Sequence, residues 1–536
     1  MVAGMNGKPI SHSLIYLYGP PSVGKSTLGK DLAEHLALPF WDLDEEIVSR
    51  SGSSIETIFS QQGEDDFRRW ERKLLKELNR NREGVISLGG GALTRPESRR
   101  LAETYGRVIV LTAPVEILLS RLKGSRANRP LLGPEPARGL KKLLTERRDH
   151  YRSFEHRLDV TGKTRDEILS RLETILGRFR IGGMGAPYQT AVCPGSLPGF
   201  GQILRDRGLV GPITVVTDHH VESLHSTPLL TSLEDAGFIP SLYAFPAGEA
   251  SKTLTTAQKI WKHFLAAGVE RTGTVIALGG GVVGDLTGFA AAVFHRGVPW
   301  VNLPTTLLAA VDASLGGKTG VDLPEGKNLL GAFHPPRLNW VDPELLDTLP
   351  EPEIRSGMAE VIKHGVIAGP DLFSLTAGGP DRYHTHREKI LHRAMAVKVE
   401  VVRRDPYEQG MRRILNFGHT VGHGVEHASG YRLSHGEAVA VGMVVETRLA
   451  ESLDLAQPGL TEQLEQALSA WKLPVSIPGR LAVDHIASAM KRDKKNINGR
   501  LQFSLPSDLG DVKHGIEIEE NLWLAALNSA LENSYD

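Results

Sequence analysis

The sequence predicts an α/β protein, with two α/β units followed by a mainly helical C-terminal unit. A single hydrophobic core stops growing near roughly 250–300 residues, so a chain of 536 residues is expected to form several domains. An apolar strand, a glycine-rich turn and a helical pattern follow one another at residues 14–36 and again at residues 275–293. From about Leu346 onward, strand patterns become rare and helical periodicity dominates.

The composition favours a soluble, cytoplasmic protein that acts on small molecules. The chain has 62 basic and 63 acidic residues, whereas nucleic-acid-binding proteins usually carry a basic excess, so no nucleic-acid partner is expected. No apolar run approaches the ~20 residues that span a bilayer, and the N-terminus lacks the features of a secretory signal, so no membrane is expected either. The single cysteine, Cys193, fits a reducing compartment.

The first glycine-rich turn predicts a site for ATP and Mg²⁺. It reads GPPSVGKS over residues 19–26 and lies between a strand and a helix whose Leu28, Leu32 and Leu36 share one face. In such a G-x-x-x-x-G-K-[ST] loop, backbone N–H groups converge on phosphate oxygens, the lysine reaches the β- and γ-phosphates, and the hydroxyl ligates Mg²⁺. The predicted nucleotide-binding residues are Gly19, Gly24, Lys25, Ser26 and Thr27.

Residues 177–187 are predicted to be a linker, because GRFRIGGMGAP holds four glycines and a proline without an apolar period. The predicted domains are therefore residues 1–176, an α/β domain over 188–346 and a helical domain over 347–536.

The second glycine-rich turn, GGGVVGD at residues 279–285, contains G-x-G-x-x-G between a strand and a helix. This arrangement can place a pyrophosphate at a helix N-terminus. The acidic residue that usually follows about 20 positions later is missing, so a dinucleotide site and a simple tight turn both remain open.

A row of histidines indicates a metal site farther along the chain. His419, His423 and His427 are spaced by one helical turn, and spacing alone predicts His419 and His423 as paired ligands. A row of structural histidines is the alternative. Glu360 and His435 are further candidate ligands.

Several motifs of the first 176 residues resemble those of shikimate kinases. They are FWDLD at 40–44, GEDDFRRWE at 63–71, GGG at 89–91 and RPLL at 129–132. The resemblance covers residues 10–176 and implies a P-loop kinase domain, built from a parallel sheet with helices and a lid.

The resemblance to shikimate kinases also implies roles for individual residues. Asp42 would organise the water shell of Mg²⁺, Asp44 would bind the shikimate hydroxyls as base or orienting group, and Arg129 would stabilise the transferring phosphoryl group. The implied substrate-binding residues are Asp44, Arg68, Gly89, Gly90, Gly91 and Arg147.

One position departs from the kinase pattern: Ser22 stands where the family usually has a third glycine in the loop. If this position has a positive φ, the serine is strained and ATP affinity is expected to suffer. The adenine-contacting lid residue stays open among Arg121, Lys123 and Arg126.

Residues 188 to about 510 resemble 3-dehydroquinate synthase. The matching motifs are GGKTG at 316–320, GKNLLG at 326–331, GMAEVIK at 357–363, NFGHTVGH at 416–423 and HGE at 435–437. The resemblance implies a Rossmann-like α/β domain, a helical metal-binding domain, bound NAD⁺, and Zn²⁺ or Co²⁺. It also implies a homodimer formed through this half.

In place of the histidine pair from spacing, this resemblance implies the metal ligands Glu360, His419 and His435, with His423 on the substrate side. The implied dinucleotide-binding residues are Asp218, Glu249, Lys252, Gly280, Gly281, Asp285, Thr305, Thr306, Asp312, Lys327, Thr348 and Glu353. The implied substrate-binding residues are Arg296, Lys318, Asn328, Lys363, Lys398, Arg412, Asn416 and Lys494. Those expected to take part in catalysis are Lys318, Asn328, Lys363, Arg412 and His423, besides Lys25, Asp44 and Arg129 in the kinase half.

Together the resemblances imply a bifunctional enzyme of chorismate biosynthesis. One half would phosphorylate shikimate to shikimate 3-phosphate, and the other would convert 3-deoxy-D-arabino-heptulosonate 7-phosphate to 3-dehydroquinate and phosphate. Three alternatives remain: another sugar-phosphate cyclase acting on sedoheptulose 7-phosphate beside a related small-molecule kinase, a zinc-dependent polyol dehydrogenase, and a non-catalytic nucleotide-binding regulatory module as the N-terminal half. The many basic residues oppose a dehydrogenase of uncharged polyols.

Overall fold

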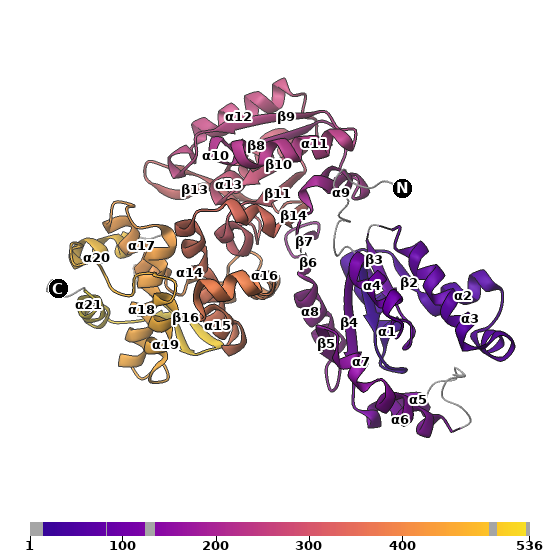
Figure 1. Cartoon of the computed structure of the whole chain (residues 1–536). Coiled ribbons are helices and arrows are strands. Elements are labelled where there is room, and N and C mark those ends of the chain that lie inside the picture. Colours follow the sequence, from indigo (N-terminus) through magenta and orange to yellow (C-terminus); the bar gives the residue numbers. More distant parts are fainter. Residues whose placement is uncertain (1–13, 82, 124–134, 493–500, 532–536) are drawn as a thin grey trace. The chain divides into compact units, whose positions relative to one another are not determined.

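The computed structural model describes residues 14–81, 83–123, 135–492 and 501–531 (Figure 1). By its internal contacts the chain divides into two compact units, one ending at Arg178 and the other beginning at Phe179. Among the described helices, none combines the length and the apolar character that a membrane span requires.

The first unit is built on a five-stranded parallel sheet of strand order β2-β3-β1-β4-β5. Alternate residues of β1 point to opposite faces: Leu14 and Tyr16 join one buried cluster, and Ile15 and Leu17 join the other. The sheet is therefore covered on both faces, as parallel sheets usually are. Its strands are β1 (Leu14–Tyr18), β2 (Phe40–Asp42), β3 (Gly84–Ser87), β4 (Gly106–Thr112) and β5 (His156–Asp159).

The helices of the first unit follow from local signals. In α1, Leu28, Leu32 and Leu36 are all buried, which confirms the predicted face. The longest helix, α3, is bent at Gly63, which has a φ of 84°. The helices are α1 (Lys25–Leu36), α2 (Leu43–Ser51), α3 (Ile55–Leu78), α4 (Pro96–Tyr105), α5 (Val115–Lys123), α6 (Pro136–Glu146), α7 (Arg148–Arg152) and α8 (Arg165–Leu176).

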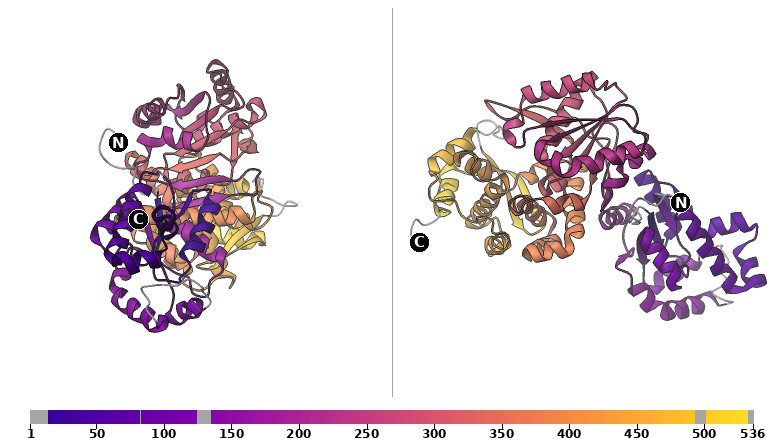
Figure 2. Two further views of the ribbon diagram at one scale, coloured as in Figure 1. Left: turned by 90° about the vertical axis from the view of Figure 1, so that its right-hand side faces the viewer. Right: turned by 45° about the horizontal axis from the view of Figure 1, so that its top comes forward.

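The second unit begins with a seven-stranded sheet of order β6-β7-β14-β11-β10-β8-β9, with helices on both faces (Figures 1 and 2). Residues of α9 and α11 pack on one face and residues of α12 and α13 on the other. The strands are β6 (Arg178–Ile181), β7 (Tyr188–Val192), β8 (Ile213–Asp218), β9 (Pro240–Phe245), β10 (Thr274–Gly279), β11 (Trp300–Pro304) and β14 (Leu338–Val341). The helices are α9 (Phe200–Asp206), α10 (His219–Val221), α11 (Thr227–Asp235), α12 (Leu254–Ala266) and α13 (Gly281–Val293).

Two features of this region differ from the prediction, which placed a linker at residues 177–187 and then strands alternating with helices. Residues 178–181, inside the predicted linker, form β6, because Phe179 and Ile181 are buried in the core of the second unit. An antiparallel hairpin, β12 (Lys318–Leu323) and β13 (Gly326–Phe333), is inserted after β11.

The rest of the second unit is mainly helical, as predicted. Its helices are α14 (Glu351–Ala368), α15 (Pro370–Thr376), α16 (Gly379–Arg404), α17 (His419–Ala428), α18 (His435–Ser452), α19 (Leu460–Ser469), α20 (Val483–Arg492) and α21 (Glu520–Ser529). One hairpin, β15 (Gln502–Asp508) and β16 (Asp511–Glu517), was not predicted.

Close packing of α14, α17 and α18 brings distant parts of the sequence together. A Cβ atom on Gly442 of α18 would collide with the carbonyl oxygen of Gly418, just before α17. A Cβ atom on Gly436 would likewise collide with the backbone of Ser356 in α14. These two glycines therefore allow α18 to approach both neighbours backbone to backbone.

Candidate active sites

The predicted nucleotide loop joins β1 to α1 in the first unit. Gly24, with a φ of 105°, precedes the first helical residue, Lys25. The Lys25 ammonium donates hydrogen bonds of 3.0 Å to the carbonyl oxygens of Gly19 and Pro20. Ser26 donates from Oγ to the Asp42 carboxylate at 2.5 Å. An ammonium, a hydroxyl and a carboxylate thus meet at the N-terminus of α1, and this donor set fits a Mg²⁺–nucleotide complex.

The predicted acceptor side of this unit is held together by a buried ion pair. Arg68 is 6% exposed and donates to Glu71 at 2.6 Å and to Glu64 at 2.8 Å. A Cβ atom on Gly91 would collide with the Arg68 guanidinium, and one on Gly89 would lie 3.1 Å from an oxygen of Asp44. The glycine turn therefore leaves room for the side chains of Arg68 and Asp44 beside it.

Arg147 joins the same region through the backbone of the glycine turn. Its guanidinium donates to the carbonyl oxygen of Gly90 at 2.8 Å, and the Tyr151 hydroxyl donates to the same oxygen at 2.7 Å.

The remaining predicted residues of the kinase half lie elsewhere. Thr27 is exposed on α1. Arg121 donates to the carbonyl oxygen of Val23 in the nucleotide loop at 3.1 Å. Arg126 and Arg129 lie outside the described residues.

Glu71 was not assigned a role from the sequence, yet it lies between Arg68 and the glycine turn. Burial raises the pKa of its carboxyl to about 7, and the neighbouring Arg68 cation opposes the rise. The importance of Glu71 comes from its buried position between Arg68 and Gly89. This position depends on how α3 packs in the fold, so the sequence alone does not reveal it.

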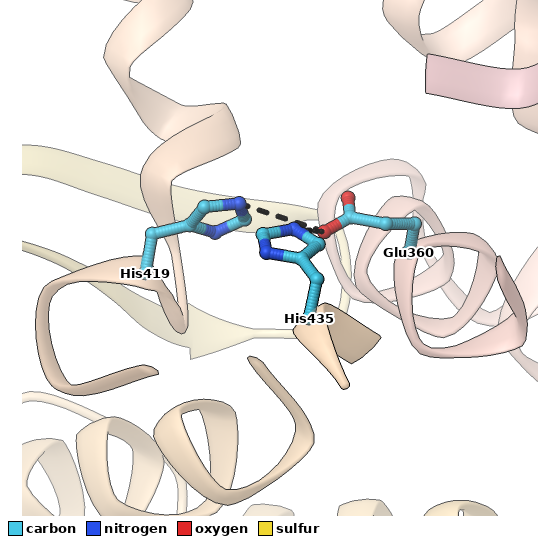
Figure 3. A group of neighbouring side chains, drawn as sticks. All are labelled: Glu360, His419 and His435. Carbon is cyan, nitrogen blue, oxygen red and sulfur yellow. Dashed lines mark ion pairs between the residues drawn. The ribbon is translucent and has the colours of Figure 1, made fainter. Parts of the chain in front are cut away.

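In the second unit, Glu360, His419 and His435 form a candidate metal centre (Figure 3). Nε2 of His419 lies 3.5 Å from Oε1 of Glu360, and Nε2 of His435 lies 3.6 Å from the same oxygen. The three side chains come from α14, the first residue of α17 and the first residue of α18. One carboxylate and two imidazoles converging on a common point fit a catalytic Zn²⁺ site.

Both histidines stand at helix N-termini that are separately fixed. Ser434 and Glu437 form a capping box around the start of α18, which holds His435. The buried Glu446 carboxylate accepts from the backbone N–H groups of Gly418 at 2.7 Å and Val421 at 3.0 Å, which fixes the turn that carries His419. The two histidines are thus placed by helix N-termini, and Glu360 lies in the middle of α14.

The charges around the candidate metal centre are strongly coupled. Glu360 is fully buried and forms an ion pair with Lys363, and although burial opposes it, this cation holds the pKa of Glu360 well below its usual range. Burial lowers the pKa of His435, but its contacts with Glu360 and Glu426 outweigh this effect and raise that pKa to about 9. Proton release is therefore expected when a cation binds.

His423 lies beside this centre but does not share it with His419. The ring centroids of His419 and His423 are 5.3 Å apart. Within the described part of the chain, no group of candidate ligands combines these two histidines; His423 instead groups with Glu426 and His435. The pairing suggested by i, i+4 spacing therefore differs from the grouping in the structure. His427 contacts the ring of Tyr431 and lies outside both groups.

Several predicted substrate-binding cations surround the centre in buried positions. Besides Lys363, Lys398 is bonded to Asp312 at 2.6 Å, and Arg412 donates to the carbonyl oxygen of Pro406 at 2.5 Å. Burial lowers the pKa of Lys398, partly offset by Asp312. A cluster of buried cations near a metal centre can hold an anionic substrate.

Glu408 is a second residue that the sequence did not reveal. It forms an ion pair with Lys318 and accepts from Asn416 at 3.3 Å, so it joins two predicted substrate-binding residues. Arg296 is exposed at the end of a 3₁₀ turn, and Lys494 lies outside the described residues.

The predicted dinucleotide residues fall into one connected group and several separate ones. A cavity beside the turn between β10 and α13 is lined by Gly280, Gly281, Asp285 and Lys318 among others. Lys252 bonds to Asp285 and to Asn328, each at 2.6 Å, and Lys327 lies 3.8 Å from Glu249. These contacts link the loop after β9 and the β12–β13 hairpin to Asp285, which lines the cavity.

The remaining predicted dinucleotide residues have other partners. Asp218 caps α10 through the backbone N–H groups of His220 and Val221, and Thr348 is bonded to His225 at 2.8 Å. Thr305 is buried, and Thr306 accepts from the Ala309 N–H at 3.1 Å. Glu353 is exposed in the first turn of α14, and Asp312 lies with Lys398.

Comparison with known proteins identifies the second unit. Residues 242–356 match the N-terminal part of 3-dehydroquinate synthase, and residues 357–496 match its C-terminal part. A 3-dehydroquinate synthase from Synechocystis is 43% identical over 334 residues, which cover 61% of this chain and 92% of that protein. The chain belongs to the 3-dehydroquinate synthase family.

The first unit adds a second enzyme to this 3-dehydroquinate synthase. Residues 21–176 match the shikimate kinase family. The chain therefore joins a shikimate kinase domain, which is a transferase, to a 3-dehydroquinate synthase, which is a lyase, in a fusion of two shikimate-pathway enzymes.

Solved structures support the fold of the synthase. A 2-deoxy-scyllo-inosose synthase, solved with carbaglucose-6-phosphate, NAD⁺ and Co²⁺, is similar with a TM-score of 0.62 and 25% identity, covering 66% of this chain and 100% of that one. A 2-epi-5-epi-valiolone synthase from Streptomyces hygroscopicus, solved with NAD⁺ and Zn²⁺, has a TM-score of 0.59 and 29% identity, covering 66% and 99%. The predicted fold class is thus confirmed.

Ser22 of the shikimate kinase domain does adopt a positive φ, of 65°. A non-glycine residue in this region costs about 1–2 kcal/mol, so Ser22→Gly is expected to raise the free energy of unfolding of this domain by about 1 kcal/mol. Urea titration of the full chain, followed by protease cleavage within the kinase domain, would measure the change. Ser22→Ala is the control, since it keeps the strained Cβ; an equal gain in both variants would show that the hydroxyl, and not φ, is responsible.

The raised pKa of Glu71 predicts a pH dependence of kinase-domain stability. Because the folded domain binds this proton more tightly than the unfolded chain between the ordinary value of 4.5 and about 7, stability should fall as pH rises through that window. The loss attributable to Glu71 is on the order of 3 kcal/mol. Glu71→Gln should flatten the slope between pH 5 and 7 in urea titrations, whereas Glu64→Gln, which removes the exposed partner of Arg68, should keep it. The same slope in all three proteins would contradict the assignment.

Proposed function

We propose that this chain phosphorylates shikimate with ATP and Mg²⁺ in its kinase domain, and that its synthase converts 3-deoxy-D-arabino-heptulosonate 7-phosphate to 3-dehydroquinate and phosphate with NAD⁺ and Zn²⁺ or Co²⁺. The observation that carries the synthase proposal is the convergence of Glu360, His419 and His435 beside the buried cations Lys363 and Lys398. A phosphorylated, carboxylated substrate would match those cations.

In the proposed synthase reaction, the metal and NAD⁺ supply a Lewis acid and a hydride acceptor when bound. The chain's own residues bind and orient the substrate. Lys318, Lys398 and Arg412 hold its phosphate and carboxylate, while Asn416 and Glu408 fix the position of Lys318 and its surroundings. In this proposal His423, whose ring lies beside that of the proposed ligand His419, moves a proton between substrate oxygen and carbon atoms.

In the proposed kinase reaction, the shikimate carboxylate is bound by Arg68, which lies against Gly91, and by Arg147, which donates to the carbonyl oxygen of Gly90. Asp44 orients the accepting hydroxyl, and Lys25 leaves its bonds to the loop carbonyl oxygens to bind phosphate. Ser26 and Asp42 hold Mg²⁺ and its water shell.

The proposal also includes organisation. We propose domains at residues 1–176, 188–346 and 347–536, a homodimer formed through the synthase half, and a cytoplasmic location, which the single cysteine favours. Light scattering of the full chain tests the dimer: a mass of one chain at micromolar concentration would contradict it.

The test of the activity is incubation of the full-length protein with the heptulosonate phosphate, catalytic NAD⁺ and Zn²⁺, followed by measurement of phosphate release and identification of the product. Formation of 3-dehydroquinate that a chelator abolishes is the expected result. In parallel, shikimate-dependent formation of ADP tests the kinase domain. Turnover of sedoheptulose 7-phosphate in place of the heptulosonate would assign the synthase to another cyclase reaction and reopen the kinase substrate.

A further inference from the structure

Glu426 occupies a position that the proposed reaction leaves unexplained. It lies in the last turn of α17, is 8% exposed, and belongs to neither the proposed ligands nor the substrate-binding residues. Its two carboxylate oxygens face different partners. Oε2 lies 3.5 Å from Nδ1 of His435, and Oε1 accepts from Nζ of Lys327 at 3.0 Å.

The contact with His435 has a direct consequence for metal binding. The other ring nitrogen of His435, Nε2, faces Glu360 in the candidate metal centre (Figure 3). A neutral imidazole that ligates a metal through one nitrogen carries its proton on the other, and a carboxylate facing that second nitrogen fixes both the tautomer and the ring orientation. Glu426 stands where such a carboxylate is needed.

The contact with Lys327 connects Glu426 to the β12–β13 hairpin. Nζ of Lys327 lies between Glu426 and Glu249, which is 3.8 Å away, and 4.6 Å from the centroid of the Tyr431 ring. The next residue, Asn328, accepts from Lys252 beside the dinucleotide cavity. Lys327 thus holds one oxygen of Glu426 and leaves the other directed at His435.

We propose that Glu426 is a positioning residue for the metal centre, which orients His435 and is itself held by Lys327 of the hairpin. The inference rests on the proposed metal role of His435. It assigns Glu426 no direct bond to the metal, although His423, Glu426 and His435 also lie within ligand distance of one another. The two roles of Glu426 predict different losses on substitution.

The experiment uses the full-length protein and Co²⁺, whose binding is followed by its visible absorption and by competition with a chelator. Glu426→Gln keeps the size of the side chain and removes its charge, and it should weaken Co²⁺ binding about 10–100-fold while the shape of the absorption spectrum is kept. Lys327→Met removes the ammonium group that pairs with Glu426, and it should weaken Co²⁺ binding about three- to tenfold. Thermal unfolding of the metal-free proteins shows whether each variant is folded.

Glu465→Gln is the matched control, because it removes the same kind of charge from an ion pair, with Arg448, that lies outside the candidate ligand groups of the described residues; its Co²⁺ affinity should equal that of the wild type. An unchanged affinity in Glu426→Gln would overturn the inference. A loss beyond about 10³-fold with an altered spectrum would overturn it in favour of direct ligation. Absence of Co²⁺ binding by the wild type would instead contradict the proposed function, so the two failures are distinguishable.

Discussion

The His419→Ala variant of this chain is expected to lose its catalytic metal, whereas His423→Ala should keep it. The free energy of binding zinc to a four-ligand site is about 10–16 kcal/mol, so one ligand accounts for about 3–4 kcal/mol, or about 10²–10³-fold in affinity. In the structure His419 faces the Glu360 carboxylate at 3.5 Å, and His423 stands outside this group. Of these two histidines, only His419 is therefore expected to reduce metal affinity when it is replaced.

Metal analysis after dialysis against a defined free Zn²⁺ concentration measures this difference, and phosphate release measures its effect on turnover. His423→Ala should bind metal normally but turn over about 10²–10⁴-fold more slowly if it transfers protons. His427→Ala is the control from the same helix face, and it should change neither quantity. Equal loss of metal from the His419 and His423 variants would restore the pairing that spacing alone suggests.

The parts of the fold that are encoded locally could be predicted from the sequence. The apolar run at residues 14–18 and the leucines of α1 identify a strand and a helix without reference to the rest of the chain. The hairpin β15–β16 could not be predicted in the same way, because Pro506 interrupts the strand pattern and the register of the ladder shifts both before Leu505 and after Pro506. Strand β6 was not predicted, because the glycines around it are typical of a linker and two apolar residues, Phe179 and Ile181, are too few to show a strand pattern. Both are buried in the structure.

The candidate sites show the same limit more clearly. The nucleotide loop is one continuous motif, so its chemistry could be predicted directly. The candidate metal centre joins residues of three helices. Spacing within one helix favours His423 over Glu360, because it carries no information on how α14 and α18 pack on α17. Family resemblance supplied that set. Glu71, Glu408 and Glu426 were given no role because their importance depends on burial and on partners distant in the sequence.

Replacement of Asp44 by asparagine is expected to slow phosphoryl transfer by the kinase domain about 10²–10⁴-fold while nucleotide binding is kept. Asp44 lies in the first turn of α2, where its backbone N–H donates to Asp42 at 3.0 Å, and its carboxylate faces the glycine turn at Gly89. Its carboxylate is therefore directed at the predicted acceptor side, whereas Asp42 is the carboxylate that contacts Ser26 of the nucleotide loop. Loss of a positioned base or orienting carboxylate lowers the rate by about 10²–10⁴-fold.

The measurement compares shikimate-dependent ADP formation with ATP binding in the full-length protein. Glu45→Gln is the matched control, since Glu45 is the next residue of the same turn and its exposed side chain forms an ion pair with Lys30. Its rate should equal that of the wild type. If Asp44→Asn transfers phosphate normally, the assigned acceptor site is wrong. A different outcome is that neither the wild type nor Asp44→Asn phosphorylates shikimate, and that ATP changes the rate of the synthase in both. In that case the N-terminal domain acts as a nucleotide-binding regulator. The two variants remove the same charge from adjacent positions of one helix. An intact rate in Glu45→Gln with a lost rate in Asp44→Asn would therefore assign the loss to the role of Asp44 in phosphoryl transfer and not to the change in charge.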